Sequence, residues 1–516
     1  MKFKKIIITL FITVGLISSI VITNRYFNQN DICCSLNELD TFELHITDKD
    51  PSTLGVKEWL DDFNHLYDFI EKNYAYLPLK ERTHGYNWLE LKQVYAERIN
   101  QAKNNKDFLA IIMDATQALQ NRHSCVMCPE SVSYYHSYYK NMYPFCKVFC
   151  NDVLKASEYW ESIYDRCYDE KYCCKFESLI IYEKGDYVVH HQTDSGEMLV
   201  GERLIVKAVN GIQVDDAIKD CFEEDYIDWD FQRNKSYIWM ISPRTFGKNA
   251  LFTLEDSGGL EIDMSFCCEK DYSIQPYSYP EMPLDFKIWP EKNTCYMNVQ
   301  TFDLIIDGYS KAFRNFYKQI VDYEHLIIDI RGNTGGFYST WINNIVLPLL
   351  SKEEKLQFYL AFKTDEYISC FRECYNLISN VPKCSFDWLP PEVQTDNYII
   401  YDYSFSFNPI YETAFNGEII LLTDNVVYSA AEAFTSFCKQ TGFATIYGTT
   451  SGGDGITPWP LYYVLPNSKI VIQLPSAMGL DHLGNANEEV RTQPDVVYES
   501  DFGYYNELIE YVLSII

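Results

Sequence analysis

The sequence predicts a multidomain α/β protein, and three features of the chain support this. At 516 residues it has room for about three folded units of roughly 150 residues each. Apolar residues make up 47% of the chain and aromatic residues 16%, which is too much core-forming material for a disordered protein. The hydrophobic periodicity changes along the chain, from helical spacing to short alternating runs, and then to strands that alternate with helices.

The boundaries of the predicted units follow these changes of pattern. In residues 50–124 apolar side chains recur at helical spacing, and later short β-like runs are separated by Gly, Asn and Asp turns. The units are an N-terminal helical domain, a Cys-rich insertion, a small β domain, a core in two parts, and an insertion or lid that separates these parts: residues 50–124, 125–175, 176–275, 285–351 with 416–516, and 352–415.

The charge balance excludes one broad class of partner. The chain has 43 Lys and Arg against 73 Asp and Glu, which gives a formal net charge of −30. Because a surface of this sign repels a phosphate backbone, we expect no nucleic-acid partner.

The first residues predict an export signal. MKFKK supplies a positively charged start, and Ile6 to Ile22 is a run without a charged residue. We therefore expect residues 1–23 to be a signal peptide or an uncleaved membrane anchor, with Lys4 and Lys5 on the cytoplasmic side. The rest of the protein would then be extracytoplasmic, either anchored to the membrane or secreted.

The cysteines are numerous and clustered. The chain has 17, and Cys125, Cys128, Cys146 and Cys150 all lie in the Cys-rich insertion. Together with the export signal, this count favours disulfides that hold a weakly periodic, peripheral segment together. Four thiolates at such short spacings also suit a tetrahedral zinc site, which remains the alternative interpretation.

Two motifs in the predicted core carry chemistry. In LIIDIRGNTGGF, residues 326–337, an apolar strand runs into a Gly-rich turn that can point backbone N–H groups at an anion. In the second motif, Ser429 follows a strand and immediately precedes Ala430, Ala431 and Glu432. Taken alone, Ser429 is best interpreted as a helix cap that Glu432 completes. The same position would also expose a nucleophile at a helix N-terminus, beside the N–H of Ala430.

These motifs resemble the serine peptidases that include the C-terminal processing proteases and the tricorn core protease. The segments 444–455 and 488–498 are similar to the later motifs of that family, the second to its closing Gly-Val-x-Pro-Asp run, in which this chain replaces the glycine. The family pattern Asp-x-Arg-x-Asn-x-Gly-Gly, followed later by Ser-Ala-x-Glu, is met by Asp329, Arg331, Asn333, Gly335, Gly336, Ser429, Ala430 and Glu432.

The resemblance also implies a fold. It implies a ββα core of the crotonase or ClpP-like type, preceded by a helical domain and a small PDZ-like β domain. The stretch from Gly201 to Val214, with its Asn210-Gly211 turn, resembles part of a PDZ domain, although an ordinary hairpin would give the same pattern.

The spacing of the motifs distinguishes between two catalytic arrangements in the family. In one branch a lysine about 25 residues after the nucleophile is the base, but residue 454 is Asp here, so a Ser–Lys pair is excluded. In the tricorn-like branch a histidine at the end of the helical domain is the base, and His123 matches it. The third member would be Glu488, with the adjacent Glu489 as an alternative. Arg122 departs from the serine that often precedes this histidine.

The resemblance therefore implies an exported serine endopeptidase that acts on proteins or peptides. Ser429 would be the nucleophile, His123 the base and Glu488 the acid that orients it, with the N–H groups of Gly336 and Ala430 as the oxyanion hole. Asp329, Arg331, Asn333 and Gly335 would support this site, with no metal or cofactor, and a homo-oligomer is an open alternative. A catalytically inactive binding protein of the same fold is the second hypothesis, and an enoyl-hydratase-like enzyme, which shares the ββα core, is the third.

Overall fold

The computed structural model describes residues 44–516 apart from short gaps, so the predicted export signal at residues 1–23 lies outside the described residues. None of the helices in the described part of the chain combines the length and apolar character that crossing a membrane requires. The gaps are residues 173–174, 177, 193–197, 242–244, 248, 266–267, 270–282, 304–306, 374–376, 378, 410–414, 458–459, 502–503 and 505.

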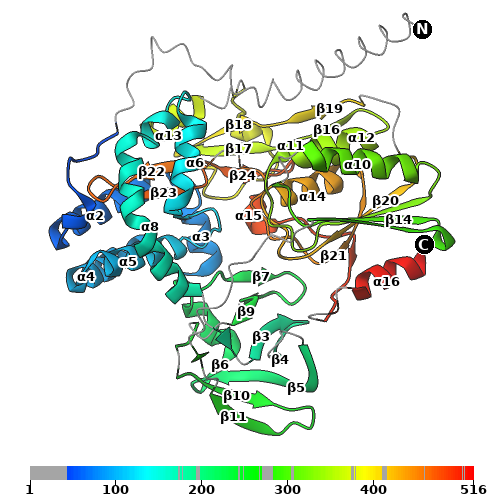
Figure 1. The fold of residues 1–516 in the computed structure, drawn as a ribbon, viewed down its shortest axis with the longest axis horizontal. Coiled ribbons are helices and arrows are strands. Elements are labelled where there is room, and N and C mark those ends of the chain that lie inside the picture. The colour runs from blue at the N-terminus through cyan, green and yellow to red at the C-terminus, as the bar shows by residue number, and fades with distance from the viewer. Residues whose placement is uncertain are drawn as a thin grey trace, which may run out of the picture.

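The N-terminal part is helical, as Figure 1 shows in blue. Helix α2 buries one face, formed by Trp59, Phe63, Leu66 and Ile70, because these residues recur every three or four positions. The helices of this part are α2 (Val56–Asn73), α3 (Leu77–His84), α4 (Lys92–Gln101) and α5 (Asn105–Gln117).

The Cys-rich segment is packed into the main hydrophobic core. It forms β1 (Cys125–Val126), α6 (Pro129–Tyr139), α7 (Phe145–Val148) and α8 (Asn151–Tyr172). Helix α8 buries Val153, Ala156, Trp160 and Ile163 at helical spacing, and the Trp160 indole donates to the Ser468 carbonyl at 2.8 Å. This periodicity is regular, so the expectation of a peripheral segment held by cross-links is wrong. Apolar and aromatic packing holds the segment instead.

The described cysteines give the disulfide prediction no support. The four on which the prediction rests, Cys125, Cys128, Cys146 and Cys150, are free thiols. Among the residues that the structure describes, no group of three or more His, Cys, Asp or Glu could hold a metal ion, so the zinc interpretation finds no support either.

A small β domain follows and lies at the bottom of Figure 1. Its antiparallel sheet has the order β11-β10-β5-β4-β3-β9, and a separate hairpin pairs β7 with β8. It has a hydrophobic core of its own. The strands are β3 (Ser178–Glu183), β4 (Asp186–Gln192), β5 (Met198–Val209), β7 (Asp228–Asp230), β8 (Lys235–Tyr237), β9 (Met240–Ile241), β10 (Leu251–Glu255) and β11 (Glu261–Ser265).

The α/β core is built on a six-stranded sheet with the order β13-β14-β15-β20-β21-β25, in which only β13 is antiparallel to its neighbour. Helices α10 (Asp307–Ile320) and α14 (Ala430–Thr441) cover one face, and α16 (Asn506–Ile515) covers the other. The strands are β13 (Leu284–Trp289), β14 (Thr294–Val299), β15 (His325–Asp329), β20 (Glu418–Thr423), β21 (Thr445–Gly448) and β25 (Val496–Val497).

The segment 352–415 is integrated into the fold. Its strand β17 (Tyr359–Lys363) pairs with β18 (Tyr398–Asp402) on one side and with β24 (Met478–Leu480) on the other. Leu360, Ala361 and Phe362 are fully buried. These strands therefore extend the core and do not form a separate lid.

The carboxyl ends of the parallel strands β15, β20 and β21 lie side by side in the sheet. The loops that follow them carry the Gly-rich motif, Ser429 and the segment 449–455. Ligands of open α/β sheets bind outside the carboxyl ends of the strands, so the fold brings the sequence motifs to the edge where a site is expected.

One partly buried histidine links α3 to the β domain and makes stability depend on pH. His84 Nε2 lies 3.2 Å from the Ile227 carbonyl, and burial, aided by the charge of Lys80, lowers its pKa to about 3. The unfolded chain binds a proton at this residue below pH 6.5 that the native protein does not bind. The free energy of unfolding should therefore fall as the pH drops from 6.5 toward 3, by up to about 1.4 kcal/mol per pH unit from this residue.

The variant His84→Gln tests this prediction. Urea unfolding measured between pH 4 and 7 should give a shallower loss of stability in the variant than in the wild type, and His65→Gln, at an exposed position, serves as the control. Parallel curves for wild type and His84→Gln would show that His84 does not cause the dependence.

Candidate active site

Ser429 lies in the loop after β20, directly before α14, with φ 55° and ψ −124°. A non-glycine residue seldom adopts this conformation, which costs of order 1–3 kcal/mol and tends to occur at functional sites. The side chain makes no capping hydrogen bond. Glu432 is buried and instead accepts hydrogen bonds of 2.7 Å from Asn487 and Thr492. The helix-cap interpretation is therefore wrong, and the Ser429 hydroxyl makes a different contact.

That contact is with His123, which lies in the loop between α5 and β1. Its Nε2 is 3.2 Å from Ser429 Oγ, and its Nδ1 is 2.8 Å from Asp454 Oδ2. A carboxylate at Nδ1 holds the proton on that nitrogen and leaves Nε2 free to accept one. Residues 306 positions apart in the chain thus form a Ser–His pair of ordinary hydrogen-bonding length, which is the geometry that a nucleophile and its base require.

Asp454 is the residue that the sequence reasoning missed as a member of the site. Its carboxylate is fully buried and accepts hydrogen bonds from the Tyr76 hydroxyl, the Asn121 amide and the Tyr428 hydroxyl, at 2.8, 2.8 and 3.3 Å. Burial acts to raise the pKa of Asp454, but the hydrogen bonds and the charge of His123 outweigh it, so the pKa lies below its usual value. The carboxylate is therefore ionised at neutral pH, beside the imidazole.

Glu488 is placed differently from the expectation. It lies in the short helix α15 (Asn487–Val490), and its Oε1 accepts a 2.6 Å hydrogen bond from Lys80 Nζ. The helix directs the side chain toward α3, and Asp454 occupies the position beside His123 Nδ1. Burial raises the pKa of Glu488, and the nearby charge of Asp454 raises it further, against the opposing effect of Lys80. The alternative, Glu489, forms an ion pair with Arg82.

The placement of Glu488 gives a prediction about stability. Glu488→Gln should lower the free energy of unfolding by about 3–5 kcal/mol, because it leaves Lys80 buried without a counter-charge. The double variant Lys80→Met/Glu488→Met should recover most of this loss. Chemical unfolding and hydrolysis per folded molecule are the two measurements. Loss of activity in Glu488→Gln without loss of stability would return Glu488 to the catalytic site.

The two glycines of the first motif are required by close packing. Gly335 and Gly336 have φ 113° and 131°. A Cβ atom at Gly335 would lie 2.8 Å from Ser429 Cβ, and one at Gly336 would overlap the backbone of Phe302 and Asp303. Within the described residues, neither the Gly336 N–H nor the Ala430 N–H donates a hydrogen bond to the protein. Both donors therefore stay available near the serine, as an oxyanion hole requires.

The remaining residues of the motif shape this loop. Arg331 binds both oxygens of Asp329 through Nε and Nη2, at 2.9 and 2.7 Å. Asn333 accepts from the Gly335 N–H at 2.9 Å, while its own amide donates to the Val299 carbonyl at 2.9 Å. The loop is thus tied both to the sheet and to its own backbone.

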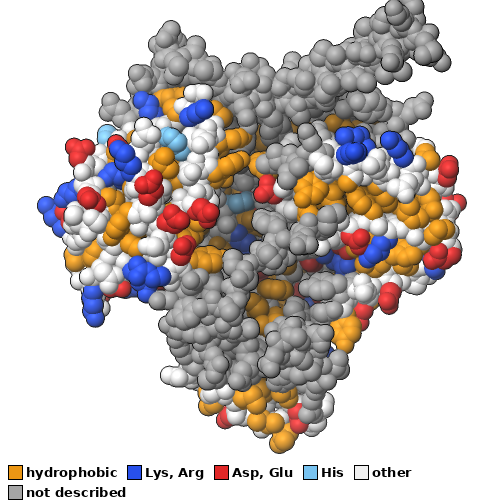
Figure 2. Space-filling model, viewed as in Figure 1, with side chains coloured by type: hydrophobic (Ala, Val, Ile, Leu, Met, Phe, Trp, Pro, Cys, Tyr) orange, Lys and Arg blue, Asp and Glu red, His pale blue; other side chains and the backbone are white. Residues whose placement is uncertain are grey.

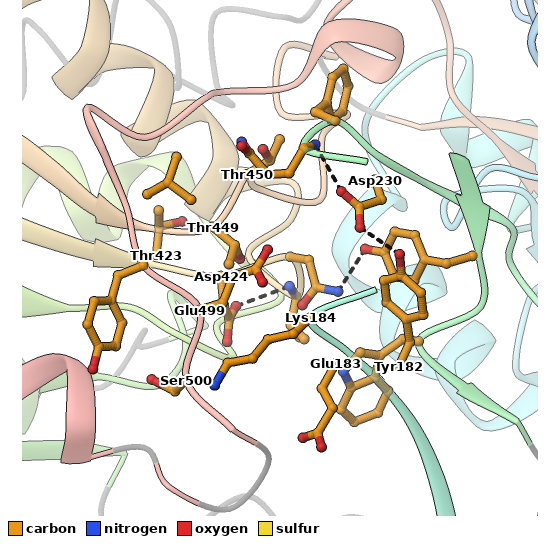
Figure 3. A pocket seen from close by; sticks show the side chains of 18 of the residues that line it. Tyr182, Glu183, Lys184, Asp230, Thr423, Asp424, Thr449, Thr450, Glu499 and Ser500 are labelled. Carbon is orange, nitrogen blue, oxygen red and sulfur yellow. Dashed lines mark hydrogen bonds between the residues drawn. The ribbon is translucent and has the colours of Figure 1, made fainter. Parts of the chain in front are cut away.

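The protein is hollowed in two places beside the α/β core. Figure 2 shows a depression between the helical part and the α/β core, with a histidine side chain visible inside it. A separate cavity of about 190 Å³ lies between the β domain and the ends of the core strands. Figure 3 shows it, with Asp230 beside Tyr182 on one wall and Asp424 on another. Neither Ser429 nor His123 lines this cavity.

Comparison with known families decides the class of protein. Residues 293–498 match the model of peptidase family S41, and residues 56–116 match the tricorn protease C1 domain. The chain is a serine-type peptidase, and its α/β core is the part that is similar to family S41. The S41 match contains Ser429 and Asp454, whereas His123 lies outside it, just after the C1 match. The S41 domain therefore receives its histidine from the helical part of the chain.

Solved structures of other peptidases resemble this chain at low sequence identity. Mature CPAF is 13% identical, with a TM-score of 0.49 over 86% of this chain and 93% of that one. The photosystem II D1 C-terminal processing protease is 12% identical, with a TM-score of 0.35 over 86% and 92% of the two chains. The tricorn protease is 14% identical, with a TM-score of 0.29 over 89% and 36%. No curated protein sequence matches the chain.

Proposed function

We propose that this peptidase cleaves peptide bonds through an acyl-enzyme on Ser429, with His123 as the general base. As Ser429 Oγ attacks the scissile carbonyl, His123 Nε2 takes its proton and then gives it to the leaving amine. Water, deprotonated by the same nitrogen, then releases the acyl group. The observation that carries the proposal is the continuous path from Ser429 Oγ to His123 Nε2, at 3.2 Å, and from His123 Nδ1 to Asp454 Oδ2, at 2.8 Å.

In this proposal Asp454, and not Glu488, orients the histidine. A buried carboxylate at Nδ1 fixes the tautomer that accepts a proton at Nε2 and stabilises the imidazolium that forms. Because Tyr76 and Asn121 also donate to Asp454, the carboxylate is held in place before substrate binds.

The N–H groups of Gly336 and Ala430 would bind the oxyanion of the tetrahedral intermediate. Removing one such donor from another protease costs about 2.7–4 kcal/mol of transition-state stabilisation. The α14 N-terminus adds a favourable dipole at the same place.

The proposal includes three further features that the sequence predicts for the base, the fold and the location of the protein. They are the tricorn-like use of a histidine base, a ββα core with a PDZ-like β domain that receives an extended peptide by strand addition, and export directed by residues 1–23. The contact between Ser429 and His123 favours the peptidase over the inactive binding protein, because a binding protein has no need of a nucleophile–base pair.

Treatment of the full chain with a fluorophosphonate tests the proposal. We expect hydrolysis of an unfolded protein substrate at internal peptide bonds, inhibition in proportion to the reagent incorporated, and modification of Ser429 in peptide mass spectra. Full inhibition with the label on another residue would refute the assignment of the nucleophile, and hydrolysis that the reagent does not affect would refute the serine mechanism.

A further inference from the structure

The segment that carries His123 is held by the β domain. Gln120, three residues before His123, is buried and has φ 54°. Its amide donates to the carbonyls of Phe222 and Asp225 at 2.7 and 2.8 Å, and its carbonyl oxygen accepts from the Ile227 N–H at 2.8 Å. One side chain thus makes three hydrogen bonds to the β-domain backbone next to the catalytic loop.

Alternate residues of this segment have different partners. Asn121 and His123 both donate toward Asp454, at 2.8 Å each. Arg122, like Gln120, turns to the β domain, where its Nη2 donates to Asp228 Oδ2 at 2.8 Å. His123 therefore lies in a segment, residues 120–123, that binds Asp454 on one side and the β domain on the other.

Asp228 binds a second arginine from the core. Its Oδ1 accepts a 2.6 Å hydrogen bond from Arg491 Nη2, and only 5% of the Asp228 side chain is exposed. Burial would raise the pKa of Asp228, but the charges of Arg122 and Arg491 lower it by more. One buried carboxylate therefore bridges two arginines from distant parts of the sequence.

Arg491 is itself an unusual residue at its position. It has φ 51° and stands where the closing family pattern Gly-Val-x-Pro-Asp has glycine. A Cβ atom at Gly453 would lie 3.1 Å from Arg491 Cγ, so the arginine packs against the loop that carries Asp454. The Gly453 carbonyl in turn accepts from the Ser429 N–H at 3.3 Å. A strained backbone of this kind persists only where surrounding contacts compensate for it, and the ion pair with Asp228 is such a contact.

We propose that Asp228 is a positioning residue for the peptidase reaction. Through Arg122 and Arg491 it holds the loop of His123 and the loop of Asp454 in fixed positions relative to each other. The inference rests on the proposed catalytic role of His123. The β domain is then part of the frame of the active site and is needed even for substrates too short to reach it.

The physical reason is the charge balance of this buried contact. Without the buried carboxylate, the partly buried Arg122 and Arg491 are two neighbouring cations that repel each other, and each is then drawn toward solvent. Arg122 is adjacent to His123, and Arg491 packs against the residue before Asp454. A shift of about 1 Å in a catalytic group can cost 10²-fold in rate, so small movements of these loops are sufficient.

The test is Asp228→Asn in the full chain, assayed with a short fluorogenic peptide. We expect kcat to fall by about 10- to 100-fold with KM within about twofold of the wild type, because chemistry and not binding is disturbed. Asp228→Glu, which restores the carboxylate, should recover part of kcat. Asp230→Asn is the matched control, since Asp230 lies in the same strand and is similarly buried, but pairs with Arg233 and Tyr182. It should leave kcat unchanged.

A second variant keeps the test decisive if Asp228→Asn fails to fold. Arg122→Gln leaves Asp228 paired with Arg491 and should show the same loss in kcat. In the folded double variant the two losses should not add, because both act through one contact. Wild-type kcat in either folded variant, or a loss confined to KM, would overturn the inference while leaving the proposed function intact. A wild-type chain without Ser429-dependent hydrolysis would instead remove the proposed function.

Discussion

Ser429→Ala should lower peptide hydrolysis by about 10⁶-fold, close to the uncatalysed background, as removal of the nucleophile does in another serine protease. The substitution deletes one oxygen, whose hydrogen-bonding partner is His123, and that oxygen does not cap α14. We therefore expect the free energy of unfolding to stay within about 0.5 kcal/mol of the wild type. Hydrolysis of a fluorogenic peptide and chemical unfolding measure the two quantities.

Ser436→Ala is the control, because Ser436 is a buried serine within α14, the helix that begins directly after Ser429. Its activity per folded molecule should equal that of the wild type. If Ser429→Ala kept more than a small fraction of wild-type turnover, Ser429 would not be the nucleophile.

Asp454→Asn should lower kcat by about 10⁴-fold with little change in KM, which is the effect of the equivalent substitution in another serine protease. The amide nitrogen of Asn can donate to His123 Nδ1 and thereby stabilise the tautomer with a proton on Nε2. That tautomer donates to Ser429 Oγ and cannot accept its proton. The measurement is steady-state kinetics on the folded variant.

Asp62→Asn is the control for the loss of a buried carboxylate. Asp62 is equally buried but accepts hydrogen bonds from the N–H groups of Asn467 and Ser468, away from the site. It should lose stability and keep its activity per folded molecule. A comparable fall in kcat for Asp62→Asn would show that the effect at Asp454 is not specific to the catalytic site.

Local motifs predicted the catalytic loops well, because their residues are close in sequence. The turn that places Gly335 and Gly336 beside Ser429 is encoded by glycines that close packing requires. His123 was matched through the family pattern, although its contact with Ser429 spans 306 residues of sequence. The parallel strands β15 and β20 bring the Gly-rich turn and Ser429 together at their carboxyl ends, whereas His123 reaches them from the loop between α5 and β1.

The carboxylate beside His123 was harder to predict, because it is placed there by contacts between distant segments. The family spacing points to position 454 as the place of a lysine, and spacing alone does not indicate that an aspartate there contacts the histidine. Asp454 is identified by donors from Tyr76 and Asn121, which lie more than 330 residues away in the chain. The apolar periodicity of α8 was also missed, because many charged residues lie between its apolar positions in the sequence. In the helix, Val153, Ala156, Trp160 and Ile163 share one face.

The intermediate itself gives the most direct test. The full chain is mixed with an activated ester substrate, quenched in acid within milliseconds, digested, and analysed by mass spectrometry for the acylated residue. A burst of leaving group close to one equivalent per active chain, with the acyl mass on Ser429, is the result that we predict. Steady hydrolysis with no acylated peptide, or with the acyl group on another residue, would contradict a mechanism that proceeds through Ser429.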